Sequence, residues 1–269
     1  MLYLERKPSP PLADCIRAFW YACAPDLAHG RERVHPTGAL QIVINLAADR
    51  LTDCGTDIGE EAPCREMPGA LIVGARSRYE VIHMRDLVEI MGIVFLPGGF
   101  APWLRHRADD FFQQSVSLDA FWSTRQLVDR LREQSTPTLK FATLDHLLTE
   151  RLRGRSAERK PIVKAALADL RHNSVRGTAR HLEISERRLH QLIREDAGLS
   201  PKLWGRIHRF QIAVKALHRG ADTHWKQLAL DCGYYDQSHF TNDFRAFSGI
   251  DPTTYSAMHG RWRNHVIIA

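Results

Sequence analysis

The chain has 269 residues, of which 44% are apolar and 25% charged, and its formal net charge is +6. This length is too great for one small domain and suits two, and the globular composition excludes a disordered or fibrous chain. No stretch approaches the ~20 consecutive apolar residues of a membrane helix, and the first seven residues lack the apolar core of a signal peptide, so we expect a soluble, cytoplasmic protein without a membrane partner.

The cysteines indicate neither a disulfide framework nor a metal site. There are five of them, an odd number, at irregular spacing. No pair has the close spacing that a zinc site requires. We therefore expect reduced thiols that pack as small hydrophobic residues in a reducing compartment.

Residues 34–98 are predicted to be rich in β-strands, because short runs of branched residues alternate there with turn residues. Before them, Leu12–Tyr21 has a spacing of apolar residues that fits either a helix or a bent strand. Thr52–Pro68 is polar, contains Gly and Pro, and is predicted to be a loop. Short strands joined by turns favour an antiparallel sandwich or barrel. The predicted strands are Leu40–Leu46, Ala70–Val73, Arg78–His83 and Leu87–Leu96.

Helical spacing begins near Ala101 and continues through residues 117–154, with a break at Thr136–Pro137. The two amphipathic helices beside this break suit either internal packing or a dimer interface. The charged stretch Arg151–Lys160 is predicted to be a linker, and Ile162–Leu170 the first helix of a second domain. We therefore divide the chain into residues 1–157, a candidate ligand-sensing or dimerisation domain, and residues 158–269.

The second half contains one pattern twice, between Ser174 and Tyr255. A shift of 51 positions aligns the capping residues, the apolar positions and the helix stops of the two copies. The aligned pairs are Ser185 with Asp236, Leu189 with Phe240, Ile193 with Phe244, Gly198 with Gly249, and Pro201 with Pro252.

Each copy predicts a short helix, a tight turn, and a second helix that starts at a capping residue and stops at a glycine. The first helices are Thr178–Leu182 and Gln227–Cys232, and a single long helix over Pro201–Arg219 separates the copies. These are two helix-turn-helix motifs at a fixed spacing. The predicted fold is α+β: an N-terminal antiparallel β-rich sandwich or barrel with trailing helices, followed by an all-α C-terminal domain.

The run from Ser185 through GLSPKLWGRIHRFQIAVKAL to CGYYDQSHFTNDFRAFSGIDPTTY closely resembles the DNA-binding domain of the AraC/XylS family of bacterial transcription regulators. The resemblance covers roughly the last 100 residues and includes the whole double motif. It implies sequence-specific binding to double-stranded DNA, because a helix fits the major groove and presents its side chains to base edges. It also makes RNA polymerase a candidate partner.

The family's pattern implies that base-reading side chains lie near the start of each recognition helix. In the second helix, Asn242 stands where the family often has Arg, which puts a guanine contact there in doubt and leaves adenine as a partner. The implied base-reading residues are Arg187, His190 and Gln191 in the first recognition helix, and Gln237, Ser238, His239 and Asn242 in the second.

The basic residues are concentrated in this half. Residues 158–269 hold 18 Lys and Arg against 11 Asp and Glu, a net charge of +7. Such a domain gains affinity for phosphate backbones, although a solvated basic face is the alternative. A rigid connecting helix places the recognition helices ~34 Å apart, one DNA turn. The candidate phosphate contacts are Arg180, Arg194, Lys202, Arg206 and Arg245.

The N-terminal half resembles a domain commonly fused to such regulators, through LADCIRAFW, HPTGALQIVINL and FLPGGFAPWL. The resemblance implies a small-molecule effector or a homodimer. The alternative is an enzyme or a DNA-damage sensor fused to a DNA-binding module. His35, His83 and Glu89 do not form a spaced ligand motif, and no phosphate loop or nucleophile elbow is present. We therefore expect no catalytic residues, metal or cofactor.

Overall fold

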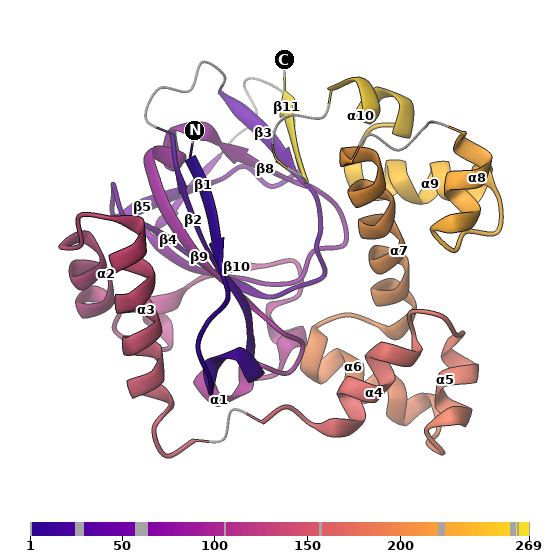
Figure 1. The fold of residues 1–269 in the computed structure, drawn as a ribbon, viewed down its shortest axis with the longest axis horizontal. Coiled ribbons are helices and arrows are strands. Elements are labelled where there is room, and N and C mark those ends of the chain that lie inside the picture. Colours follow the sequence, from indigo (N-terminus) through magenta and orange to yellow (C-terminus); the bar gives the residue numbers. More distant parts are fainter. Residues whose placement is uncertain are drawn as a thin grey trace.

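The computed structural model describes residues 2–24, 30–56, 64–104, 106–155, 158–219, 224–258, 262 and 264–268. Two antiparallel β-sheets lie beside a helical half that is built along one long helix (Figure 1). The predicted α+β fold is confirmed. Part of the predicted loop, residues 57–63, and part of the predicted linker, residues 156–157, fall outside the described residues.

The larger sheet has the strand order β1-β2-β9-β4-β7-β10, and the smaller one β11-β3-β8-β5-β6. In the larger sheet the strands are β1 (Leu2–Arg6), β2 (Ile16–Cys23), β9 (Glu89–Phe95), β4 (Gln41–Asn45), β7 (Ala70–Val73) and β10 (Ser115–Ser117). In the smaller sheet they are β11 (His265–Ile268), β3 (Arg31–Val34), β8 (Glu80–His83), β5 (Arg50–Asp53) and β6 (Arg65–Pro68).

Alternation along the strands of the larger sheet creates two different faces. Ile42 and Ile44 of β4 are fully buried in the main N-terminal core, where they share a cluster with Phe141 and Leu144. Gln41 and Val43, the alternate residues, face a cavity between the two sheets.

The helices that trail the sheets cover the outer face of the larger sheet. They are α1 (Ala101–Leu104), α2 (Arg125–Arg132) and α3 (Pro137–Leu152). Thr136 caps α3 by accepting a hydrogen bond from the Leu139 N–H at 3.3 Å, which explains the predicted break. Leu148 and Leu152 of α3 are buried in the N-terminal core. These helices therefore pack internally, and a dimer interface on them stays a prediction.

Several strand assignments need correction. Leu12–Tyr21 contains a 3₁₀ turn, Leu12–Asp14, followed by most of β2, and Leu87–Leu96 begins in a second 3₁₀ turn, Met84–Val88. The predicted loop Thr52–Pro68 contains the end of β5 and all of β6. β6 is a largely exposed edge strand, so its sequence lacks the apolar alternation that marks a half-buried strand.

The expectation that all cysteines are free is wrong for one pair. Cys54 and Cys64 form a disulfide. Asp53 of β5 is paired with Arg65 of β6, so the antiparallel register brings the two adjoining cysteines together. Cys15, Cys23 and Cys232 are free. A ten-residue separation along the chain did not reveal this pairing, because it depends on a strand the sequence did not show.

The helical half follows the predicted order closely. Its helices are α4 (Pro161–Asp169), α5 (Val175–His181), α6 (Glu186–Ala197), α7 (Pro201–His218), α8 (Trp225–Asp231), α9 (Gln237–Ser248) and α10 (Pro252–Met258). They share one core, which contains Leu189 and Ile193 of α6, Phe210 of α7, and Phe240 and Phe244 of α9. No helix in the described part of the chain is long and apolar enough to cross a membrane.

The last strand crosses the predicted boundary between the domains. β11 follows α10 but pairs with β3, with His265 opposite Val34 and Ile268 opposite Arg31. The division at residue 158 stays a prediction, and residues 265–268 lie within a sheet of the N-terminal half.

Candidate DNA-binding interface and effector cavity

The two candidate recognition helices, α6 and α9, are built alike. Each has 12 residues. The Ser185 hydroxyl accepts a hydrogen bond from the Arg188 N–H at 3.1 Å, and an Asp236 carboxylate oxygen accepts one from the His239 N–H at 2.7 Å. Gly198 and Gly249 stop the helices at φ values of 74° and 75°, a conformation that glycine adopts without strain. The predicted caps and stops are therefore confirmed.

The duplication contains one extra residue that the 51-position alignment conceals. In the turns, the Ile184 N–H donates to the Ala179 carbonyl at 3.0 Å, and the Tyr234 N–H donates to the Ala229 carbonyl at 2.9 Å. The shift is thus 50 residues up to the turn and 51 in the recognition helices. The inserted residue is Tyr235, whose side chain is 88% exposed.

All seven candidate base-reading residues lie on exposed positions of α6 and α9. Gln191 donates a hydrogen bond to Glu195 at 2.9 Å and accepts one from Arg188 at 3.1 Å, so its amide is already oriented along the helix surface. His239 lies 3.8 Å from the Asp243 carboxylate. Sequence reasoning did not single out Thr241, which the 51-residue shift matches to His190. The set of base-reading residues stays a prediction.

The candidate phosphate contacts differ in how they are held. Arg180, Lys202 and Arg245 are exposed. Arg194 lies 3.6 Å from Asp109 of the N-terminal half. Arg206 forms an ion pair with the buried Asp243 at 2.7 Å, and its guanidinium lies 5.1 Å from the centre of the Phe247 ring. The geometry of Arg206 is that of a side chain holding α7 against α9.

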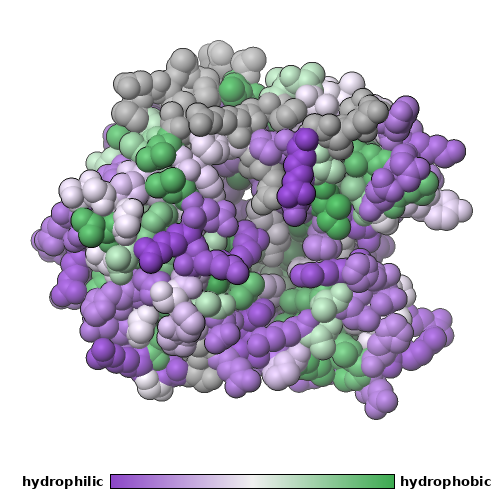
Figure 2. Space-filling model, in the orientation of Figure 1, coloured by the Kyte–Doolittle hydropathy of each residue, from purple (hydrophilic) through white to green (hydrophobic). Residues whose placement is uncertain are grey.

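The connecting helix α7 sets the separation of the two motifs. It has 18 residues, which corresponds to about 27 Å of helix. The first motif, α5 and α6, lies at one end of α7, and the second motif, α8 and α9, at the other (Figure 1). The outer edge of both motifs is mostly hydrophilic (Figure 2).

The N-terminal half holds both recognition helices at equivalent positions. The Gly98 N–H donates to the Asp196 carbonyl at 2.6 Å, and the Tyr79 N–H donates to the Phe247 carbonyl at 2.8 Å. Asp196 and Phe247 are 51 residues apart and lie in the last turns of α6 and α9, where carbonyls have no partner within the helix. Two loops of the N-terminal half therefore cap the same carbonyl in each motif.

Further contacts fix the helical half against the sheets. The Gln211 side chain of α7 donates to the Pro36 carbonyl at 2.8 Å and to the Asn264 side chain at 2.9 Å. α7 is thereby tied both to the N-terminal half and to the segment that leads into β11.

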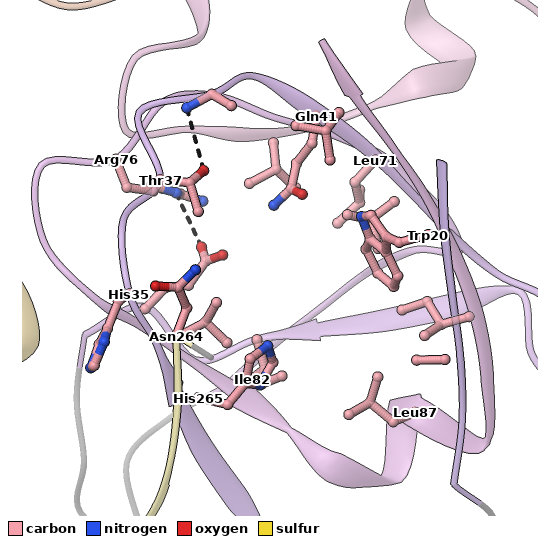
Figure 3. A pocket seen from close by; sticks show the side chains of 18 of the residues that line it. Trp20, His35, Thr37, Gln41, Leu71, Arg76, Ile82, Leu87, Asn264 and His265 are labelled. Carbon is pink, nitrogen blue, oxygen red and sulfur yellow. Dashed lines mark hydrogen bonds and ion pairs between the residues drawn. The ribbon is translucent and has the colours of Figure 1, made fainter. Parts of the chain in front are cut away.

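A cavity of about 460 Å³ lies between the two sheets, and Figure 3 shows side chains from both projecting into it. This volume lies within the range of small-molecule sites. Its walls come from β2, β4, β7 and β9 of one sheet and β5 and β8 of the other. His218 at the end of α7, Asn264 just before β11 and His265 at its start also line the cavity.

His35 lies where the cavity meets the helical half. It is 2% exposed, and its ring lies 5.6 Å from the Phe210 ring and 5.4 Å from the Tyr255 ring. Neither ring nitrogen has a hydrogen-bond partner among the described residues. Burial, with smaller effects of His265 and Arg33, lowers the pKa of His35 to about 3, so its imidazole is neutral.

The three residues considered for a metal site have separate surroundings. His35 packs against aromatic rings, whereas His83 accepts a hydrogen bond from the Arg85 N–H at 3.3 Å. Glu89 accepts a hydrogen bond from the Tyr21 hydroxyl at 2.9 Å and lies 3.3 Å from Lys140. Within the described ranges, no group of three or more His, Cys, Asp or Glu residues is arranged to hold a metal ion.

Comparison with known proteins identifies both halves. Residues 178–258 match the family described as a helix-turn-helix domain, and residues 4–117 match the family described as Domain of unknown function (DUF6597). No curated protein matches the chain.

Similar solved structures include the C-terminal domain of AraT, a response regulator from Geobacillus stearothermophilus, at 23% identity and a TM-score of 0.34, covering 38% of this chain and 91% of that one. A DNA-binding transcriptional dual regulator from Escherichia coli K-12 has 25% identity and a TM-score of 0.31, covering 36% and 86%. Fatty-acid-bound ToxT from Vibrio cholerae has 11% identity and a TM-score of 0.46, covering 93% and 96%.

The matched domain and the geometry of α5 to α9 define the class: the chain is a DNA-binding transcription regulator of the helix-turn-helix type. Within that class, the duplicated motif on a shared connecting helix is of the AraC type, which confirms the resemblance seen in the sequence.

Proposed function

We propose that this regulator binds one asymmetric DNA site by placing α6 and α9 in successive major grooves, and that a small molecule in the cavity between the sheets modulates this binding. Arg187, His190 and Gln191 read bases in one groove, and the exposed face of α9 reads bases in the next. Arg180, Lys202 and Arg245 contact the phosphates between them.

The observation that carries the DNA-binding proposal is the equivalence of α6 and α9. The two helices match in length, cap and stop, and each exposes its candidate base-reading residues. Because α7 joins the two motifs as one continuous helix of about 27 Å, we expect α6 and α9 to lie about one DNA turn apart, ~34 Å. If the exposed faces of α6 and α9 were merely solvated, there would be no reason for the two helices to match in length, cap and stop.

The modulation proposal is supported by the segments that line the cavity. Gly74 and Arg76 line it, and the same loop continues to Tyr79, whose N–H caps α9. Thr37 and Ala39 also line it. Gly38 lies between them and packs against α7, because a Cβ built on Gly38 would lie 3.4 Å from the Ile207 side chain. A ligand that moves either loop changes a contact made by the DNA-binding half, which is the differential interaction that coupling requires.

Selection of bound sites from random DNA, followed by hydroxyl-radical footprinting with the full chain, tests the proposal. We expect protection in two adjacent major grooves. Arg187→Ala or Gln191→Ala should weaken specific binding by roughly 1–3 kcal/mol and relax the preference at one or two base pairs. Arg130→Ala on the exposed face of α2 is the control and should change neither. An equal loss on random DNA would contradict base reading by these residues.

A further inference from the structure

An aromatic wall lines one side of the cavity. Trp20 of β2 is paired with Gly92 of β9, and a Cβ at Gly92 would overlap the Trp20 indole. The absence of a side chain at residue 92 therefore lets the indole lie over the strand. The Tyr3 ring stacks beside Trp20 with centroids 6.3 Å apart and an interplanar angle of 18°, and Trp262 lies 5.2 Å beyond Tyr3.

Aliphatic side chains form the remaining walls. Leu71 comes from the larger sheet, and Ile82 from the smaller one. Figure 3 shows both of them and Leu87 around the same space as Trp20. An aromatic wall with aliphatic surroundings favours a flat, largely apolar ring system, because such a ligand buries its faces against both.

Two neutral polar groups project into this apolar space. The Gln41 amide points to the middle of the cavity, and the indole N–H of Trp20 lies on the side facing it (Figure 3). Neither group has a hydrogen-bond partner among the described residues. Both groups are therefore available to hydrogen-bond a ligand that offers a donor and an acceptor.

The part-buried arginine of the lining already has partners. Among the described residues that line the cavity, two arginines face four carboxylates. Arg76 lies 3.1 Å from Glu80 and donates a hydrogen bond to Ser115 at 2.6 Å. Asp86 accepts a hydrogen bond from the Thr52 N–H at 2.6 Å. The second arginine, Arg17, is exposed.

An anion in this cavity would therefore lose its hydration without gaining a buried, uncommitted cation. The cost of moving an unpaired carboxylate from water into such a site is large. A neutral group of the same shape avoids this desolvation cost.

We propose that the cavity binds an uncharged aromatic ligand that carries a carboxamide-like donor and acceptor, with its ring against Trp20 and its polar group at Gln41. This inference rests on the proposed function, in which the cavity is the effector site. We therefore expect the cavity to bind an aromatic carboxamide more tightly than the carboxylate that carries the same ring system.

Calorimetric titration of the full chain with a matched probe pair, 2-naphthamide and 2-naphthoate, tests the ligand class. The two probes share one ring system and differ in charge at neutral pH. We expect 2-naphthamide to bind at least 10-fold more tightly than 2-naphthoate. Equal binding, tighter binding of the carboxylate, or binding of neither probe would overturn the proposal.

Two variants locate the binding. Gln41→Leu removes the amide at similar volume and should weaken 2-naphthamide binding at least 10-fold without lowering the melting temperature. Gly92→Ala displaces the Trp20 ring and should abolish binding. Gln126→Leu, on the exposed surface of α2, is the matched control and should bind as the wild type does. Unchanged binding by both cavity variants would contradict the assignment.

The effector role is measured separately, as the affinity of the full chain for its selected DNA site without ligand, with 2-naphthamide and with 2-naphthoate. If the amide binds with the expected preference while DNA affinity is unchanged, the effector role fails and the ligand class stands. If only 2-naphthoate changes DNA affinity, the ligand class fails and the effector role stands.

Discussion

Tyr235 is the residue by which the second helix-turn-helix motif exceeds the first. It stands just before the cap of α9 and is 88% exposed, beside the exposed start of this candidate recognition helix. We expect it to lie against the DNA. Tyr235→Ala should weaken binding to the selected site severalfold and leave the melting temperature unchanged, which gel-shift titration and thermal unfolding measure. A lower melting temperature with unchanged DNA affinity would assign Tyr235 to folding instead.

His35 should make stability depend on pH. Its pKa is lowered to about 3 in the folded chain, against about 6.5 when unfolded. Between these values the unfolded state binds the extra proton, so stability is present above pH 6.5 and falls as the pH drops toward 3.

His35→Phe keeps a ring against Phe210 and Tyr255 but cannot titrate. The stability of the variant relative to the wild type should therefore increase as the pH falls from 7 to 5, by at most about 1.4 kcal/mol per pH unit. Chemical denaturation at the two pH values measures this difference. A constant difference would show that His35 is not the titrating group.

At the scale of the elements, the packing of α9 into the helical core depends on Phe244. This residue is 0% exposed, and its ring lies 5.1 Å from Phe210 and 5.4 Å from Tyr255. Phe244→Ala should lower the free energy of unfolding by roughly 3–5 kcal/mol, as measured by urea denaturation. Asn242→Ala, an exposed change on the same helix, should stay within roughly 0.5 kcal/mol. An unchanged denaturation curve for Phe244→Ala would contradict the packing role.

The helices were predictable because their signals are local. Ser185, Asp236, Gly198 and Gly249 act on the nearest turn of their own helix, so the sequence places their ends within a residue. The strands are different. β3 reads Arg-Glu-Arg-Val, yet Glu32 and Arg33 are 4% and 8% exposed. Their partners come from distant parts of the chain: His265 lies 2.7 Å from Glu32, and the Arg33 guanidinium lies 5.5 Å from the centre of the Tyr79 ring. No local pattern contains that information.

The candidate site likewise has parts that the local sequence predicts and parts that depend on distant residues. The exposed faces of α6 and α9 follow from helical periodicity, whereas Tyr235 was concealed by an alignment that fits the recognition helices alone. The cavity could not be predicted, because its lining joins Tyr3 to His265 through two sheets. Arg206 was assigned to phosphate without regard to its partner Asp243, which lies 37 residues away.

At the scale of the whole molecule, the helical half should bind DNA by itself. Its core consists almost entirely of residues from α4 to α10, whereas β11 belongs to a sheet of the other half. A fragment of residues 158–258 should therefore bind the selected site with strong salt dependence, as measured by fluorescence anisotropy. Failure to bind at low salt, with the full chain as control, would show that the loops at Gly98 and Tyr79 are needed to hold the motifs in place.

The pairing of β3 with β11 also sets an order of events during synthesis. β3 ends at Val34 and its partner begins at His265, so the ribosome must add some 230 residues in between, which takes roughly 10–50 s. Until then, one edge of the smaller sheet stays open and the cavity lacks Asn264 and His265 from its lining. A nascent chain therefore completes the lining of this cavity only after both α6 and α9 have been translated.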